Sequence, residues 1–170
     1  MQESVDGDLL RTAMRFVPAT VTVVTVGGEE PRGVTIASFT SVSLDPPLVS
    51  FNVQRSARFY GLIRAAGRFA VHVLSAEQAH LSDRFANPVL DRAQQFDGVP
   101  FAEQPDGLPL LEGALATFVC EPWAEYDAGD HSLFVGRVVA IGALDQGEPV
   151  LYYQRSYRVV GAEVAPRVDP

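Results

Sequence analysis

Residues 34–41 read Val-Thr-Ile-Ala-Ser-Phe-Thr-Ser, and four of these eight side chains carry hydroxyl groups. Threonine is β-branched and common in strands, so an ordinary strand is one interpretation. Alternation along a single strand over residues 34–43 places positions 35, 37 and 39 on one face and positions 36, 38 and 40 on the other. Small or hydroxylated side chains then occupy positions where a packed core usually has large apolar side chains. This pattern favours a surface that a flat ligand with polar edges can approach.

Strand-like segments surround this stretch. Residues 20–26 are rich in β-branched side chains, and the glycine-rich residues 27–33 predict a turn, so residues 20–43 are typical of a hairpin. Further strands are predicted over residues 48–53, 69–74, 114–126, 131–144, 150–153 and 157–160.

Three helices are predicted between them. Residues 8–17 carry an apolar stripe at helical spacing, with Asp6 or Asp8 as the N-cap and Pro18 as the terminator. Ser56 is expected to cap a helix over residues 57–66. Ser75-Ala76-Glu77-Gln78 has the capping-box pattern and predicts a helix that continues to Ala86. Residues 87–113 are rich in Pro, Gly and Asp and are expected to form a long irregular segment, functional or a lid.

Many antiparallel strands with few helices predict a mostly β chain folded as a closed or partly closed barrel with peripheral helices. A parallel dinucleotide-binding sheet is not indicated, because no Gly-x-Gly-x-x-Gly joins a strand to a helix. The length of 170 residues fits one domain over 1–170, with a core over about residues 9–160.

Composition excludes several function classes. The formal net charge of −8 argues against nucleic-acid binding, which requires clustered cations. The single cysteine, Cys120, lies in an apolar run and is expected to be a buried thiol in a reducing compartment. No segment resembles a signal peptide or a membrane span, so a cytoplasmic location is expected. No metal-ligand spacing or nucleophile elbow is present, so neither a metal site nor a hydrolase is expected.

Two further segments are candidates for ligand binding. Residues 52–58 read Asn-Val-Gln-Arg-Ser-Ala-Arg, a strand end that enters a helix. A helix N-terminus presents free N–H groups, and Ser56 with Arg55 or Arg58 would complete a phosphate pocket. The other interpretation is a capped helix with two solvated arginines. Gly129-Asp130-His131 lies at a turn between two long strands and exposes a histidine.

Together these segments resemble the flavin reductase family with the FMN-binding split-barrel fold, the reductase partners of two-component flavin monooxygenases. The similarity runs from about Leu9 to Tyr157. The segments that carry it are Thr22-Val23-Val24-Thr25, residues 33–48 (Gly-Val-Thr-Ile-Ala-Ser-Phe-Thr-Ser-Val-Ser-Leu-Asp-Pro-Pro-Leu), Phe69-Ala70-Val71-His72-Val73-Leu74, Gly113-Ala114-Leu115-Ala116 and Gly129-Asp130-His131.

The resemblance implies a homodimer of Greek-key barrels that binds FMN or FAD near the subunit interface, with NADH or NADPH as hydride donor and an oxygenase as possible partner. The positions that match the family's flavin-lining residues are Thr35, Ala37, Ser38 and Ser41, those matching its ribityl and phosphate contacts are Asn52, Ser56 and Arg58, and a further flavin-side segment is Arg84, Phe85 and Ala86. His131 matches the histidine that positions the nicotinamide, and Tyr153 lies in the last-strand region near that cofactor.

Two positions depart from the family pattern, since Thr20 replaces a common glycine and His72 a common asparagine. The choices between FMN and FAD and between NADH and NADPH stay open. An arginine near the nicotinamide ribose could favour NADPH by pairing with its extra phosphate, but the sequence places neither Arg155 nor Arg158 there. A flavin-binding or haem-binding barrel without reductase activity is the alternative function.

Overall fold

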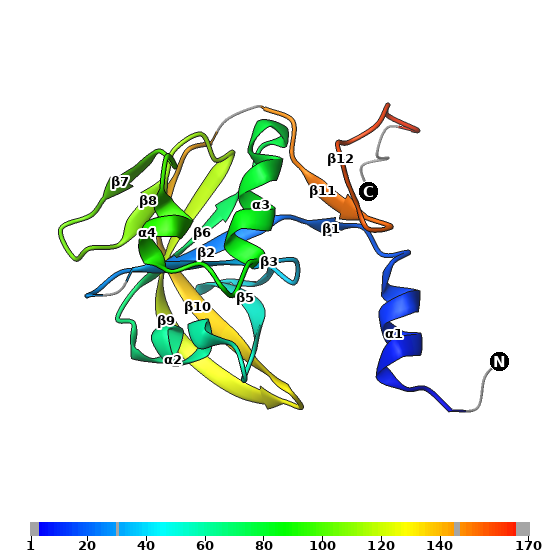
Figure 1. Cartoon of the computed structure of the whole chain (residues 1–170), viewed down its shortest axis with the longest axis horizontal. Helices are drawn as coiled ribbons and strands as arrows, with labels where there is room; N and C mark the ends of the chain where they lie inside the picture. The colour runs from blue at the N-terminus through cyan, green and yellow to red at the C-terminus, as the bar shows by residue number, and fades with distance from the viewer. Residues whose placement is uncertain (1–3, 30, 145–146, 166–170) are drawn as a thin grey trace.

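The computed structural model describes residues 4–29, 31–144 and 147–165. Its centre is a seven-stranded antiparallel sheet in the order β3-β2-β6-β9-β10-β5-β4, which curls into an open barrel (Figure 1). The strands are β2 (Thr22–Val26), β3 (Arg32–Ile36), β4 (Thr40–Leu44), β5 (Pro47–Gln54), β6 (Phe69–Val73), β9 (Ala116–Ala128) and β10 (His131–Gly142). The expectation of a mostly β split barrel is confirmed.

The opening in the barrel lies at the hydroxyl-rich stretch. β3 pairs with β2 and β4 pairs with β5, so β3 and β4 are the two edge strands of the sheet although they are consecutive in sequence. Residues 37–39 lie outside both strands and carry the chain from one edge to the other. The prediction of one continuous strand over residues 34–43 is therefore wrong, and its face alternation does not extend past Ile36.

The first two helices differ from their predictions. α1 spans Gly7–Met14, with the carboxylate of Asp6 accepting from the Leu9 N–H at 2.8 Å, and it ends before the predicted Val17. None of its residues is buried in the described part of the chain, so its apolar stripe is not packed within this subunit. α2 spans Arg58–Ala65, and its N-cap is Ala57 rather than Ser56.

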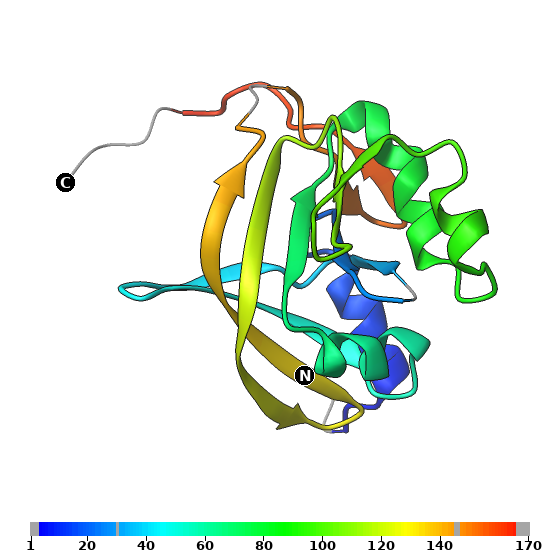
Figure 2. The ribbon, with the colours of Figure 1, turned by 90° about the vertical axis from the view of Figure 1, so that its left-hand side faces the viewer.

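The capping box at Ser75 is confirmed, although it opens a short 3₁₀ turn, Ala76–Gln78, that leads into α3 (Ala79–Ala86). Residues 87–113 are more regular than expected, since they contain α4 (Arg92–Phe96), β7 (Phe101–Glu103) and β8 (Pro109–Leu111). The buried Gln95 amide joins this segment to β3, because it accepts from the Gly33 N–H and donates to the Gly33 carbonyl, both at 3.2 Å. Figure 2 shows α3 and α4 together at one side of the sheet and the β4–β5 hairpin projecting at the other.

A second, three-stranded sheet joins the two ends of the chain. It consists of β1 (Ala19–Thr20), β11 (Leu151–Tyr153) and β12 (Ser156–Arg158), with β11 in the middle. The Gln154 N–H donates to the Arg15 carbonyl at 3.2 Å and so fixes the β11–β12 turn to the end of α1. Residues from both termini therefore reach the open side of the barrel.

Aromatic and aliphatic side chains fill the barrel core. Phe51 and Phe69 are almost fully buried and meet edge to face, with ring centroids 5.4 Å apart. Cys120 is fully buried beside them, and burial raises the pKa of its thiol to about 12. The thiol stays protonated near neutral pH, which agrees with the expected structural role. Across the described residues, no helix is long and apolar enough to cross a membrane.

His72 is fully buried on β6, between two threonines. Thr25 donates its hydroxyl proton to the Pro109 carbonyl at 2.7 Å, so the same oxygen accepts from Nε2 of His72 at 3.0 Å. Nδ1 then accepts from the Thr117 hydroxyl at 3.2 Å. The ring is a neutral member of a hydrogen-bonded chain, and burial lowers the pKa of His72 to about 3.

This histidine predicts acid sensitivity of the fold. Between pH 6.5 and about 3 the unfolded chain binds a proton at His72 that the folded chain does not. The free energy of unfolding therefore rises with pH across that window, and the contribution of His72 is fully present above it. The expected slope from this one group is up to about 1.4 kcal/mol per pH unit. Urea unfolding at several pH values should show that the free energy of unfolding changes less steeply with pH in His72→Asn than in the wild type. Equal slopes would contradict the assignment.

Candidate functional site

A groove of about 1320 Å³ lies along the open side of the barrel. Its walls come from several places in the chain: the end of α1 with the β11–β12 turn, β1, β3 with residues 37–39, the end of β5 with the start of α2, the end of α3, Gln95 of α4, and the start of β10. The volume exceeds the usual range of roughly 300–1,000 Å³ for a single small-molecule pocket. The groove is therefore large enough for a dinucleotide-sized ligand or for two ligands together.

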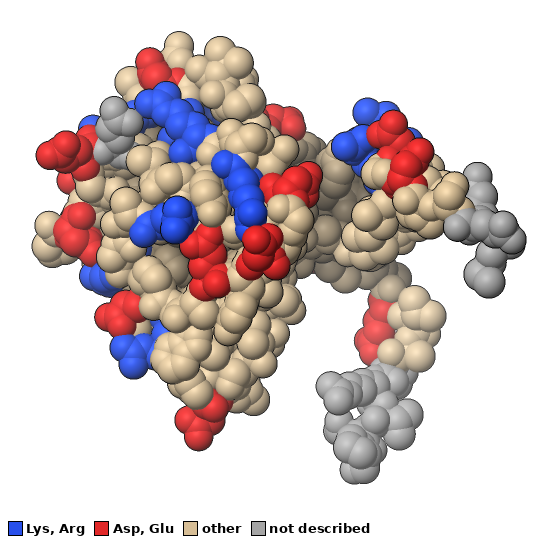
Figure 3. Space-filling view, turned by 90° about the horizontal axis from the view of Figure 1, so that it is seen from below, with Lys and Arg blue, Asp and Glu red and all other residues tan. Residues whose placement is uncertain are grey.

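The groove is basic although the protein is acidic. All thirteen cationic residues of the chain are arginines, and the formal net charge is −8. Acidic and basic side chains are interspersed over the face seen in Figure 3. None of the described groove residues, by contrast, is Asp or Glu. The arginines that line it are Arg11, Arg15, Arg32, Arg58 and Arg155. Such a site favours an anionic ligand.

The start of α2 forms a further part of the groove wall. Ala57 is the N-cap, and within the described structure no side chain caps the helix. The alanine side chain cannot accept a hydrogen bond, although the Ala57 carbonyl accepts from the Tyr60 N–H at 3.0 Å, and the helix dipole adds a partial positive charge at this end. Ser56, Ala57 and Arg58 line the groove at this point. The geometry matches a phosphate site at a helix N-terminus.

The crossing between β3 and β4 forms the next wall. Thr35 donates its hydroxyl to the Ser82 carbonyl at 2.6 Å, and the Ser38 hydroxyl accepts from the Asn52 N–H at 2.9 Å. Both hydroxyls thus connect elements of the fold. Ala37 and Ser38 are exposed and lie outside the sheet ladders, so their main chain is open to the groove. The polar groups available to a ligand here are backbone groups as much as hydroxyls.

His131 stands at the start of β10 and lines the groove. Its Nδ1 lies 2.7 Å from Oδ1 of Asp130. The hydrogen bond and the charge of the imidazole lower the pKa of Asp130, so that side chain is ionised near neutral pH. Because Asp130 engages Nδ1, the remaining polar atom of the ring is Nε2.

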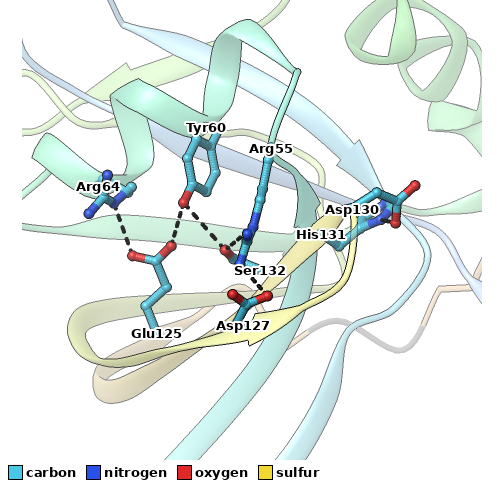
Figure 4. Close-up of polar contacts among 8 residues, drawn as sticks. All are labelled: Arg55, Tyr60, Arg64, Glu125, Asp127, Asp130, His131 and Ser132. Atoms are coloured by element: carbon cyan, nitrogen blue, oxygen red, sulfur yellow. Dashed lines mark hydrogen bonds and ion pairs between the residues drawn. The ribbon is translucent and has the colours of Figure 1, made fainter.

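The turn that carries His131 is braced against α2, as Figure 4 shows. The Arg55 main-chain N–H donates to the Asp130 carbonyl at 3.0 Å, its guanidinium lies 2.5 Å from Asp127, and its Nε donates to the Ser132 hydroxyl at 3.3 Å. The Asp127 carboxylate raises the pKa of Arg55, and Arg55 lowers the pKa of Asp127. Arg55 does not line the groove. Of the two arginines that could complete a phosphate pocket with Ser56, Arg58 lines the groove and Arg55 does not, so the pocket with Ser56 and Arg58 stays a prediction.

A second set of contacts completes the brace. Tyr60, on α2, donates its hydroxyl to Glu125 on β9 at 2.8 Å, and Arg64 lies 3.0 Å from the other carboxylate oxygen. The Arg64 guanidinium also lies over the Tyr60 ring, 5.5 Å from its centroid. These bonds lower the pKa of Glu125, with the Tyr60 bond as the largest cause. The helix start and the histidine turn therefore form one connected unit.

Most of the predicted ligand-binding residues come together in this groove. Those that line it are Thr35, Ala37, Ser38, Asn52, Ser56, Arg58, Phe85, Ala86 and His131. Thr20, the first departure from the family pattern, also lines it, whereas His72, the second, lies in the core. His72 therefore contributes no side chain to the described groove wall.

Three predicted residues lie outside the lining. Ser41 pairs with Val49 in the β4–β5 ladder. The Arg84 guanidinium donates to the carbonyls of Gln94 and Asp97 and so holds α4. Tyr153 follows Tyr152, and neighbouring residues of a strand point to opposite faces, so it is Tyr152 that lines the groove.

The sequence analysis missed one wall of the groove. The residues concerned are Arg11, Met14, Arg15 and Gln154, together with Arg155, which the sequence alone could not place. They come from opposite ends of the chain, and the pairing of β1 with β11 brings them together. No local pattern in the sequence indicates this pairing.

The model of the flavin reductase-like domain family matches residues 14–161. The chain belongs to the flavin reductase family. The family identification made from the sequence is thereby confirmed, as is the expectation of an enzyme of the flavin reductase class. Among curated relatives, the reductase subunit of stachydrine N-demethylase from Rhizobium meliloti is 42% identical over 79% of this chain, and the match spans 58% of that longer protein. The NADH-dependent FMN reductase of Agrobacterium fabrum is 40% identical over 84% of this chain and 79% of its own length.

Solved flavin reductase structures have the same fold. The NADH:FAD oxidoreductase of Streptomyces globisporus, in complex with NAD and FAD fragments, is 38% identical and superposes with a TM-score of 0.87 over 96% of this chain and all of that one. The flavin reductase component of a bacterial two-component tryptophan halogenase is 41% identical, with a TM-score of 0.85 over 93% of this chain and all of that one.

Proposed function

We propose that this flavin reductase transfers hydride from a reduced nicotinamide dinucleotide to FMN or FAD and that the reduced flavin leaves for a partner oxygenase. The observation that carries the proposal is the arginine-lined groove at the barrel opening, whose described lining residues include neither Asp nor Glu. It has an uncapped helix N-terminus for a phosphate and open main chain for a flat polar ring. These donors fit a flavin nucleotide.

Each wall has a role in this proposal. The first turn of α2, with Ser56 and Arg58, would hold the flavin phosphate. The main chain of Ala37 and Ser38 would meet the polar edge of the ring. His131 would position the nicotinamide, and Asp130 would hold the imidazole in place at 2.7 Å.

When bound, the flavin supplies the acceptor for a hydride from the reduced nicotinamide. The chain itself contributes alignment. Holding two reactants in contact can lower a barrier by roughly 7–11 kcal/mol, so proton transfer by a side chain is not required. The hydrogen bond from the Arg55 main-chain N–H to the Asp130 carbonyl supports such a role, because alignment of two ligands requires a rigid groove wall.

We propose NADH as the physiological donor, because the names of the FMN reductase of Agrobacterium fabrum and of the FAD oxidoreductase of Streptomyces globisporus both state NADH. One of them is named for FMN and the other for FAD, so both flavins are proposed as substrates. The enzyme should be mixed anaerobically with NADH or NADPH and excess FMN or FAD in a stopped-flow instrument. Bleaching of the flavin absorbance is expected, fastest with NADH. Absence of bleaching with every pair would reject the reductase function and favour a cofactor-binding protein.

His131→Ala tests the positioning role. We expect the KM for NADH to rise about tenfold, because one aligning contact worth about 1.4 kcal/mol is lost, while the flavin dissociation constant stays unchanged. Steady-state kinetics and flavin titration measure the two quantities. His80→Ala is the matched control, since His80 is exposed on α3 outside the groove. An unchanged KM in His131→Ala would refute the role.

We also propose a homodimer. The apolar stripe of α1 is unburied, with Leu10 and Met14 more than half exposed, and Phe16, just after the helix, is more than half exposed too. On the projecting β4–β5 hairpin, Val42 and Leu44 are exposed as well. A second copy of the chain could cover these surfaces. Light scattering after size-exclusion chromatography should give twice the chain mass, and a monomer at micromolar concentration would contradict the proposal.

A further inference from the structure

The turn between β11 and β12 has an unusual composition for its conformation. Tyr153 pairs with Ser156, so Gln154 and Arg155 form a two-residue hairpin loop. Their φ angles are +48° and +63°. Hairpin loops with positive φ at both positions favour Asn-Gly, because side chains such as those of Gln and Arg are disfavoured in the left-handed region. For the stability of the fold alone, Asn-Gly would be more favourable at these two positions than Gln-Arg.

Both turn residues line the groove. Their main chain is anchored to α1, because the Gln154 N–H donates to the Arg15 carbonyl at 3.2 Å. Arg15 lines the groove too, and both arginine side chains are exposed. The turn therefore brings two cations from opposite ends of the chain to one wall, where none of the described lining residues is acidic. An anion bound between like charges would relieve their repulsion.

This wall is separate from the helix N-terminus. The α2 site is made by residues 56–58, whereas this one is made by Arg15 and Arg155 from elements at the chain ends. A reductase must hold two phosphorylated molecules at once, and the groove volume of about 1320 Å³ allows for this. A second cationic wall is the feature that a second phosphorylated ligand requires.

We propose that Arg155, with Arg15, forms a second anion site that binds a phosphate group of the nicotinamide dinucleotide. The inference rests on the proposed reductase function and adds a specificity-determining site to it. Arg155 contributes a fork of N–H donors that suits phosphate oxygens. The left-handed turn is retained because it directs these donors to the ligand, at a cost in stability.

The test uses the double variant Gln154→Asn/Arg155→Gly, which places Asn-Gly in the turn. With FMN as the flavin, we expect the KM for NADH to rise about tenfold at unchanged kcat, and Tm to rise by about 2–4 °C because the strain is removed. Rising salt should weaken NADH binding less in the variant than in the wild type. Arg155→Lys keeps the charge and should recover part of the affinity. Arg158→Gln is the control, because Arg158 belongs to the same hairpin but does not line the groove.

The choice of substrates separates the possible phosphates. FMN has no second phosphate, so an effect seen with FMN assigns the site to the nicotinamide dinucleotide. Equal effects on NADH and NADPH place the pyrophosphate there, and a larger effect on NADPH places its extra phosphate there; both support the proposal. An effect confined to FAD, or an unchanged KM for both dinucleotides, overturns it. Absence of turnover in the wild type would instead refute the reductase function itself.

Discussion

Ala57→Asp is expected to stabilise the free protein and to weaken flavin binding about 100-fold. An aspartate at the N-cap of α2 would supply the side-chain cap that the described helix does not have, and it would add a favourable charge at the positive end of the helix dipole. The gain in stability is about 1 kcal/mol. The same carboxylate occupies the donors proposed for the flavin phosphate and repels it. A loss of charge-assisted hydrogen bonds together with that repulsion corresponds to about 3 kcal/mol of binding energy.

Flavin titration and thermal unfolding of the same variant measure the two opposite effects. Ala57→Asn is the matched control, because asparagine caps the helix without a charge and should weaken binding only about tenfold. If Ala57→Asp gained the cap, seen as a higher Tm, and still bound FMN as tightly as the wild type, the phosphate would have to bind elsewhere. A variant that bound flavin poorly because it had unfolded would be recognised by its lowered Tm.

Gly136→Ala is expected to destabilise the fold by about 3 kcal/mol, which corresponds to a fall in Tm of about 6–12 °C. A Cβ at this position on β10 would lie 2.3 Å from Cζ of Phe69 and 3.1 Å from Cβ of Cys120. Phe69 is 1% exposed and packs edge to face on Phe51, so the ring has no free space to enter. The methyl group therefore forces a shift of the backbone between β10 and its neighbours.

Urea unfolding gives the stability difference directly. Gly142→Ala is the control on the same strand, because no atom lies within 4 Å of its added Cβ, and a change within about 0.5 kcal/mol is expected there. A similar small effect at Gly136 would show that β10 adapts and that the core packing does not require a glycine at this point.

The fold class could be predicted because strand signals are local. The run from Thr22 to Val26 is β-branched throughout, and the glycines after it indicate the turn to β3. The break at Ala37 could not be predicted, because it depends on β3 and β4 pairing with different partners far along the chain. Residues 34–43 keep the composition of one strand, although tertiary pairing divides it into two.

The same difference between local signals and long-range contacts explains which residues of the candidate site could be predicted. Ser56 and Arg58 could be assigned to the groove because a helix start is a local feature. Arg55, with the same charge and three positions from Arg58, turned away to Asp127, and only the position of the β9–β10 turn reveals this. The wall with Arg15 and Arg155 arises from contacts between the two chain ends, for which the sequence carries no local signal.

The barrel opening also bears on the solubility of the protein. Edge strands present unpaired main-chain groups, and an exposed edge can recruit a strand of another chain and begin aggregation. Here both edges, β3 and β4, border the same three-residue crossing. β4 is further protected by a register irregularity between Ser41 and Ser43, which interrupts the regular ladder that a foreign strand would need. The barrel opening is thus short and irregular enough to discourage the pairing of a foreign strand with either edge.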